Sequence, residues 1–204
     1  MKVIHIIPSA FSYFDDIRSN AFYVVDNLSK IGVETEAITI EFGMTVPTAV
    51  REAIGEEAPS QKYQGLAPMS QVMASLDQFD IIHVHCPLFG AAGKILSWKR
   101  QHPNRCLVVT YYRRVMIPDF FSLLIVAYNF YYLPRLLAAA EVVITPALRS
   151  MPWSLQRRNQ RIIEIDESPS FNGVDVTVNP DGEVLSPGEQ LAMKYAMVYT
   201  TIVN

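Results

Sequence analysis

Short apolar runs alternate along the chain with stretches whose apolar residues recur at helical spacing. Residues 2–8 form a continuous apolar run, which is typical of a strand buried on both faces of a parallel sheet. Residues 19–31 have helical periodicity and offer Ser19 or Asn20 as an N-cap. Residues 33–40 alternate apolar and acidic side chains, which predicts a more exposed strand. The start of the chain therefore predicts one β-α-β unit.

The same alternation continues to the end of the chain. Further strands are predicted at residues 79–85, 106–111, 141–145 and 161–165, and further helices at residues 88–100, 118–140 and 187–202. Pro134 lies inside the second of these helices and is a place for a bend. Residues 41–78 are the least regular part, because proline and glycine break them into short segments. Strands that alternate with helices predict an α/β fold, a doubly wound Rossmann-like parallel sheet whose ligands bind at the carboxyl ends of the strands.

Composition and charge narrow the choice of partners. Half of the 204 residues are hydrophobic and 18% are charged, so the chain can form one large folded domain. The net charge of −3 hides a segregation: residues 61–163 carry twelve basic and four acidic side chains, whereas residues 1–60 carry four and nine and residues 164–204 one and seven. A basic middle beside an apolar aromatic helix suits an anionic membrane surface or a phosphate-bearing ligand. A solvated basic face with no partner is the alternative.

The cysteines and the apolar stretches bear on location. Cys86 and Cys106 are too few for a disulfide scaffold, and the first residues contain no apolar secretory leader. The longest apolar stretch, residues 120–133, is shorter than the roughly 20 residues that cross a bilayer. The sequence therefore predicts a cytoplasmic protein, with a peripheral position on the inner membrane face as the alternative. Cys86 is expected to be a buried thiol rather than a nucleophile.

The loop after the first predicted strand is a candidate site without a glycine. Residues 9–16 contain none, so bare backbone cannot cradle a phosphate there, and the chain has no dinucleotide or P-loop motif. Asp15 and Asp16 lie where a doubly wound fold meets its ligand, which suits binding of a hydroxyl group or a role as base. Turn-forming surface acids are the alternative.

His83 and His85 lie two apart in a predicted strand, so both point to one face of the sheet. His85 is at the carboxyl end of the strand and is expected to face a ligand, whereas His83 is expected to be a hydrogen-bonded histidine near the sheet surface. A metal ion would need a third ligand that the sequence does not announce, so no metal site is predicted.

Arginines follow the predicted strands where the carboxyl-end loops should be. Arg113 and Arg114 follow the strand at 106–111 directly, and four more lie further on: Arg149, Arg157, Arg158 and Arg161. Guanidinium groups at that edge suit bidentate capture of a phosphate. The sequence shows no aromatic residues interleaved with these arginines in the way that nucleic-acid binding favours, so no nucleic-acid partner is expected.

The order of several short motifs resembles that in the N-terminal, acceptor-side domain of GT-B-fold glycosyltransferases, in particular the retaining family-four group. The matching segments are residues 2–8, 20–39, 79–88 with the pattern D-x-x-H-x-H, 108–112, 140–146 and 171–175 with the pattern N-G-V-D. Residues 185–199 resemble the helix that crosses back from the second domain of such enzymes onto the first. The resemblance implies one domain over residues 1–175, with a turn and a helix over 176–204 that pack back on it. The nucleotide-sugar-binding domain that normally intervenes is missing from this pattern.

Three features of the family's donor site are absent or altered. No glutamate in the chain is followed by another glutamate eight positions later. Two acids and Ile17 replace the family's glycine-rich loop, and Tyr112 stands where the family has a histidine. On this comparison Tyr112 and Asp16 are the candidate catalytic residues. The candidate substrate-binding residues are Asp15, Asp16, His85, Arg113 and Arg114. No cofactor is expected.

Three functions are compatible with the sequence. The resemblance implies an acceptor-binding domain for a polyprenyl phosphate or a lipid-linked sugar, which works with a separate nucleotide-sugar-binding chain in glycan or glycolipid synthesis. The second function is a catalytically inactive scaffold or regulatory module that retains the fold. The third is a small-molecule enzyme on a flavodoxin-like fold that uses Asp15, His85 and Tyr112.

Overall fold

The computed structural model describes residues 1–8, 15–40, 63–67, 69–114, 122–157, 161–166 and 185–203. Its strands are β1 (Lys2–Pro8), β2 (Glu34–Ile40), β3 (Tyr63–Ala67), β4 (Ile81–Cys86), β5 (Cys106–Tyr111), β6 (Val142–Thr145) and β7 (Ile162–Glu164). Its helices are α1 (Asp15–Lys30), α3 (Met69–Ser75), α4 (Ala92–Gln101), α5 (Ser122–Ala127), α6 (Leu133–Ala139), α7 (Trp153–Gln156) and α8 (Pro187–Val203). Three short helical segments complete the description: η2 (Leu76–Gln78), the π-helical η3 (Tyr128–Tyr132) and η4 (Leu148–Ser150).

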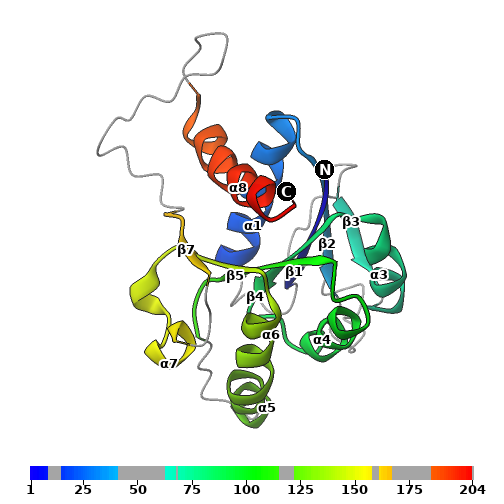
Figure 1. Ribbon diagram of the computed structural model, residues 1–204, viewed down its shortest axis with the longest axis vertical. Helices are drawn as coiled ribbons and strands as arrows, with labels where there is room; N and C mark the ends of the chain where they lie inside the picture. The colour runs from blue at the N-terminus through cyan, green and yellow to red at the C-terminus, as the bar shows by residue number, and fades with distance from the viewer. Residues whose placement is uncertain are drawn as a thin grey trace, which may run out of the picture.

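The predicted doubly wound fold is confirmed. The strands form one 7-stranded sheet in the order β3-β2-β1-β4-β5-β6-β7, and every pairing is parallel. The strand order reverses between β1 and β4, because the chain first builds outward to β3 and then returns to add β4 to β7 on the other side (Figure 1). In open α/β sheets such a switch point opens a crevice at the carboxyl ends of the two strands, where ligands bind.

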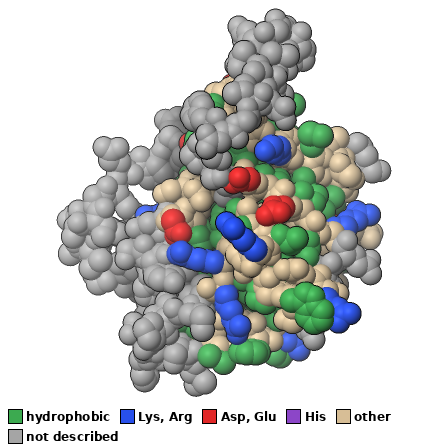
Figure 2. Space-filling model, turned by 90° about the vertical axis from the view of Figure 1, so that its left-hand side faces the viewer, with side chains coloured by type: hydrophobic (Ala, Val, Ile, Leu, Met, Phe, Trp, Pro, Cys, Tyr) green, Lys and Arg blue, Asp and Glu red, His purple; other side chains and the backbone are tan. Residues whose placement is uncertain are grey.

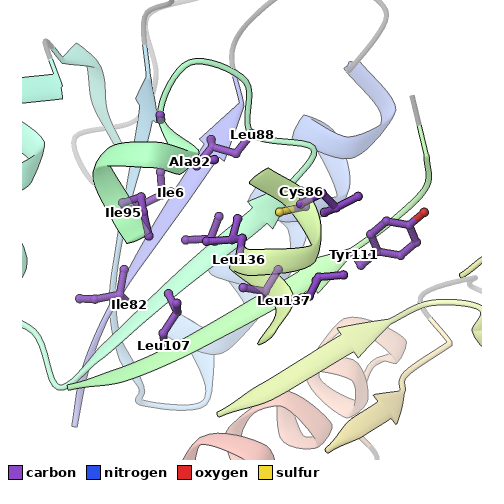
Figure 3. Close-up of a cluster of buried hydrophobic side chains, with 14 of the residues drawn as sticks. Ile6, Ile82, Cys86, Leu88, Ala92, Ile95, Leu107, Tyr111, Leu136 and Leu137 are labelled. Carbon is purple, nitrogen blue, oxygen red and sulfur yellow. The ribbon is translucent and has the colours of Figure 1, made fainter. Parts of the chain in front are cut away.

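Helices cover both faces of the sheet. In Figure 1, α1 and α8 lie over one face, and α4 and α6 lie over the other. The α4/α6 face is packed with aliphatic side chains: Ile82 and Leu107 of the sheet meet Ile95 of α4 and Leu136 of α6 (Figure 3). Complete removal of such side chains from water supplies most of the stabilisation of the fold.

Helix α1 begins earlier than residue 19, where the sequence predicted its start. It starts at Asp15, so Ser19 and Asn20 are exposed residues inside the helix and the prediction of an N-cap there is wrong. The cause is one additional apolar turn: Ile17 is 1% exposed and extends the buried stripe of the helix toward its N-terminus.

Residues 122–139 form one helical stretch in three parts, and residues 118–121 of the predicted helix lie outside the described residues. A π-helical segment, η3, separates α5 from α6, and Pro134 lies in the first turn of α6. The irregular turn therefore precedes the proline. Pro134 donates no backbone hydrogen bond and its ring crowds the preceding turn, and the wider π-helical turn accommodates both effects. The short strand β3 and helix α3 also form in the segment that the sequence predicted to be irregular.

None of the helices in the described ranges is both long and apolar enough to span a bilayer. Several predictions concern residues outside those ranges: most of the loop at 9–16, the N-G-V-D motif at 171–175 with the proposed domain boundary, and Arg158.

Candidate functional site

A cluster of three histidines lies at the switch point of the sheet. The parallel register places His5 of β1 directly opposite His83 of β4, and His85 follows on the same face of β4. The ring centroids of His83 and His85 are 4.4 Å apart and those of His5 and His83 are 4.7 Å apart. All three side chains are completely buried. We call these residues the histidine cluster.

Hydroxyl groups of α8 and β5 flank His83 of the histidine cluster. The Tyr199 hydroxyl of α8 lies 2.6 Å from His83 Nδ1, and the Thr110 hydroxyl of β5 lies 2.7 Å from His83 Nε2. Because a neutral imidazole has one donor and one acceptor nitrogen, one of these hydroxyls donates to His83 and the other accepts from it. The structure thus confirms His83 as a hydrogen-bonded histidine.

The second half of the network runs from His5 toward the carboxyl edge of the sheet. His5 Nδ1 lies 3.0 Å from His85 Nε2, and His85 Nδ1 lies 3.1 Å from the Tyr112 hydroxyl. His5 Nε2 is buried without a hydrogen-bond partner. The network is therefore continuous from His5 to Tyr112 but incomplete at its inner end.

The electrostatics of the cluster favour neutral imidazoles. Burial lowers the pKa of His85 to about 3. Burial also lowers the pKa of His5 and of His83 well below the usual histidine range, and each of these is further lowered by the nearby His85. At neutral pH all three rings are therefore uncharged, and each has one ring nitrogen that carries no proton.

Charged residues meet at the carboxyl edge beside this network. Tyr112 is the first residue after β5 and is 7% exposed, and its ring packs with Ile17 of α1. Arg113 follows and forms an ion pair with Asp16 of α1 at 3.2 Å between Nη2 and Oδ1, with both side chains about half exposed. The edge thus carries an exposed cation–anion pair directly above the buried network.

The structure brings some of the predicted site residues together and separates others. His85 contacts Tyr112, and Arg113 contacts Asp16, so these four predicted residues fall into two adjoining pairs. The described part of Asp15 is its backbone, as the first residue of α1. Arg114 is exposed and its guanidinium lies 5.1 Å from the Phe130 ring centroid. The roles assigned to these residues stay predictions.

The later arginines lie between β6 and β7, and Arg149 directly precedes Ser150, whose hydroxyl donates to the Tyr112 carbonyl at 3.3 Å. On the side of the molecule that carries β7 and α7, basic side chains lie among hydrophobic and a few acidic ones (Figure 2). Arg149, Arg157 and Arg161 are all exposed, and Arg157 lies over the Trp153 ring at 4.4 Å from its centroid. Arg157 thus has one aromatic neighbour, and the expectation of no nucleic-acid partner stays a prediction.

Cys86 meets the expectation of a buried thiol. It is completely buried at the end of β4, and burial raises the pKa of its thiol to about 12. A thiol that stays protonated at neutral pH is a poor nucleophile.

An exposed aromatic surface adjoins the site. It consists of four apolar side chains of α5 and η3 that are between 37% and 69% exposed: Val126, Phe130, Tyr131 and Tyr132. Arg135 lies over the Tyr131 ring, 3.7 Å from its centroid. The exposed aromatic surface therefore combines apolar ring faces with guanidinium groups at its edge.

The sequence did not indicate His5, Thr110 or Tyr199 as partners of His83 and His85. One signal was present: His5 occupies the middle of an apolar run, as His83 does, and polar residues in such runs need buried partners. The pairing register and the α8 contact, which decide what those partners are, come only from the three-dimensional fold.

No protein-family model matches the sequence, and no curated protein matches it. Solved structures of α-glucosyltransferases do match the fold. One, in complex with UDP and a 13-mer DNA containing a central A:G mismatch, has a TM-score of 0.53 and 10% identity over 81% of this chain and 40% of that chain. Another, with UDP and a 13-mer DNA containing a HMU base at 1.9 Å resolution, has a TM-score of 0.49 and 9% identity over 72% and 36%.

These matches define a class of fold. The chain has a glycosyltransferase-like, Rossmann-type α/β fold, and at this identity the likeness extends to the fold alone. The chain spans about two fifths of the length of the glucosyltransferases that it matches.

Proposed function

We propose that this chain is a glycosyltransferase-related acceptor-binding domain that works with a separate nucleotide-sugar-binding chain in glycan or glycolipid synthesis. The observation that carries the proposal is the placement of Tyr112 and the Arg113–Asp16 pair beside the switch point of a glycosyltransferase-like sheet. Ligands of such sheets bind at this edge. The absence from this sequence of a glutamate pair eight positions apart supports a separate chain as the binder of the nucleotide sugar.

The roles of the edge residues follow from their chemistry. Arg113 and Arg114 bind the phosphate of the acceptor, since guanidinium forks match phosphate oxygens. Asp16, with Asp15 beside it in sequence, accepts hydrogen bonds from hydroxyl groups of a sugar, and in the reaction Asp16 removes a hydroxyl proton. His85 holds Tyr112 through the 3.1 Å hydrogen bond and is a positioning residue.

The acceptor is a lipid-linked sugar, whose sugar hydroxyl is the attacking group and whose lipid phosphate lies at a membrane surface. The exposed aromatic surface beside Arg114 supports this choice, because aromatic rings and arginines favour the interface between headgroups and acyl chains. An anionic leaflet adds attraction of roughly 1 kcal/mol for each basic residue near it.

Flotation with vesicles tests the acceptor side. Wild-type chain is mixed with vesicles of equal parts phosphatidylglycerol and phosphatidylcholine, and the Arg113→Glu/Arg114→Glu double variant is compared with Arg100→Glu. Arg100 is exposed at the end of α4, which leads to the opposite edge of the sheet. We expect the double variant to bind at least about tenfold more weakly and Arg100→Glu to bind like wild type. Equal binding by all three would refute the membrane assignment.

Native mass spectrometry tests the partner. The chain, isolated gently from its own cells, is expected in a complex with a second chain that a photoreactive UDP-sugar labels. A chain that is isolated alone, or with a partner that takes no label, contradicts the proposal.

A specific observation favours the second candidate, an inactive scaffold. Tyr112 stands in the position of the family's histidine, is 7% exposed, and has its hydroxyl directed to the buried His85. Such a group stabilises the fold and presents little surface to a substrate. If Tyr112→Phe destabilises the chain but leaves transfer by the assembled complex unchanged, the residue is structural.

A further inference from the structure

The fold brings a third candidate metal ligand, His5, next to His83 and His85, which the sequence alone did not indicate. His83 and His85 share one face of β4, and the register with β1 adds His5 from the far end of the sequence. Each of the three histidines offers a ring nitrogen, and these three atoms all lie within 4.8 Å of one another. Nitrogen ligands about 2.0–2.1 Å from a tetrahedral zinc ion are roughly 3.3 Å apart, so small shifts of the rings suffice to bind one.

The hydrogen bonding of the metal-free cluster is incomplete. His5 Nε2 has no partner although the side chain is completely buried. His5 Nδ1 and His85 Nε2, only 3.0 Å apart, share a single proton in the metal-free state.

We infer that the histidine cluster is a structural site for a divalent transition metal of the zinc type, held by His5, His83 and His85. The ion takes the place of the proton shared between His5 and His85, and that proton moves to the second nitrogen of the ring that carried it, so both imidazoles stay neutral. His85 keeps its hydrogen bond to Tyr112 through Nδ1, the arrangement in which a second group fixes the orientation of a metal-bound imidazole.

His83 must release one of its two hydroxyl partners to bind the ion. The released oxygen, Tyr199 or Thr110, lies 2.6 or 2.7 Å from the ring nitrogen that it leaves. It is therefore close enough to serve as the fourth ligand and complete a closed, four-coordinate site. Imidazole nitrogens favour zinc over magnesium or calcium, which prefer oxygen ligands. Since burial keeps the rings neutral at pH 7, as their lowered pKa values indicate, they need no costly deprotonation of an imidazolium.

The ion would tie together three parts of the fold. β1 and β4 flank the switch point, and α8 covers the cluster through Tyr199 and Tyr195. Because the cluster is sealed from solvent, the ion enters during folding rather than by diffusion into the finished structure.

The experiment is refolding of the full chain, unfolded and stripped with a chelator, in the presence of equimolar zinc or cobalt(II). We expect one ion per chain by elemental analysis and, with cobalt, the intense visible bands of a tetrahedral site. X-ray absorption of the zinc-loaded wild-type chain should count three imidazoles. This measurement needs no variant and so holds even if the substitutions prevent folding.

Matched variants assign the ligands. His5→Gln, His83→Gln and His85→Gln should each weaken metal binding by at least about tenfold, while His102→Gln, the fourth histidine and outside the cluster, should leave it unchanged. Less than one bound ion per chain, fewer than three imidazoles around zinc, or metal binding that survives loss of a cluster histidine would overturn the inference.

Discussion

The two faces of the sheet differ in the side chains at their central positions. Under α4 and α6 the sheet presents aliphatic side chains such as Ile82 and Leu107 to Leu136 (Figure 3). Under α1 and α8 aliphatic side chains such as Val3 and Val108 are also buried, but the histidine cluster and Thr110 lie among them and contact Tyr199 of α8. Buried polar groups lose hydration and are tolerated only where partners compensate them. One face is therefore optimised for packing, and the other gives up part of that stability to hold a polar network beside the carboxyl edge.

The largest expected difference between the faces is a response to pH. In metal-free chain the histidines of the cluster have a pKa near 6.5 when unfolded and well below it when folded, about 3 for His85. The free energy of unfolding should be highest above pH 6.5 and should fall as the pH drops from 6.5 toward 3. Each histidine contributes a slope of up to about 1.4 kcal/mol per pH unit, because the unfolded chain takes up protons that the folded chain does not.

Urea unfolding with a chelator at pH 7, 6, 5 and 4 measures this slope. The groups around the cluster are hydroxyls of Tyr112, Tyr199 and Thr110, which do not titrate in this range. His5→Gln should have a shallower slope than wild type, and His102→Gln is the control at a histidine outside the cluster. Equal slopes in all three proteins would show that the cluster does not stay neutral.

The aliphatic face should respond to loss of volume. Leu136→Ala removes a completely buried side chain and should lower the free energy of unfolding by about 2–5 kcal/mol at any pH. Val126→Ala, in α5 of the same helical stretch, trims a side chain that is 49% exposed and should cost far less. Urea unfolding of the two variants compares them, and similar losses would contradict the packing described here.

The contact between α1 and α8 is tight at one glycine. A Cβ at Gly188 would collide with the side chain of Asn27. Gly188→Ala should therefore destabilise the chain by about 1–3 kcal/mol. Asn27→Ala in the same chain should remove part of this penalty, which a double-mutant cycle by thermal or urea unfolding would detect. A cycle with no coupling would mean that α8 lies elsewhere.

The smallest predicted effect isolates a single hydroxyl of the polar face. Tyr199→Phe removes the group 2.6 Å from His83 Nδ1 and should cost about 1 kcal/mol. Tyr23→Phe, on an exposed ring of α1, is the control and should be neutral. The polar network would be energetically unimportant if both variants had wild-type urea midpoints.

Much of the fold follows from local pattern. The apolar runs of β1, β4 and β5 and the alternation with helices were sufficient to predict a doubly wound sheet, because each signal lies within a few residues. The start of α1, the strand β3 and the π-helical segment were not predicted, since tertiary packing overrides weak local preferences there.

The site was predictable only in part. The alternation of side chains along β4 correctly placed His83 and His85 on one face. The assignment of Tyr112 and Arg113 to the site stays a prediction. His5 could not be joined to His83 and His85, because the contact depends on a register between strands that are 78 residues apart at this pair. The pairing of Arg113 with Asp16 likewise depends on how α1 returns along the sheet.

The central claim, an acceptor site at the carboxyl edge that lacks its own donor site, is tested most directly by NMR. Isotope-labelled chain is titrated separately with farnesyl phosphate, a short polyprenyl phosphate, and with UDP-glucose. The account predicts that farnesyl phosphate shifts the amide signals of Asp16, Tyr112, Arg113 and Arg114 and that UDP-glucose shifts none of them. Shifts confined to other parts of the chain with farnesyl phosphate, or binding of UDP-glucose at this edge, would contradict it.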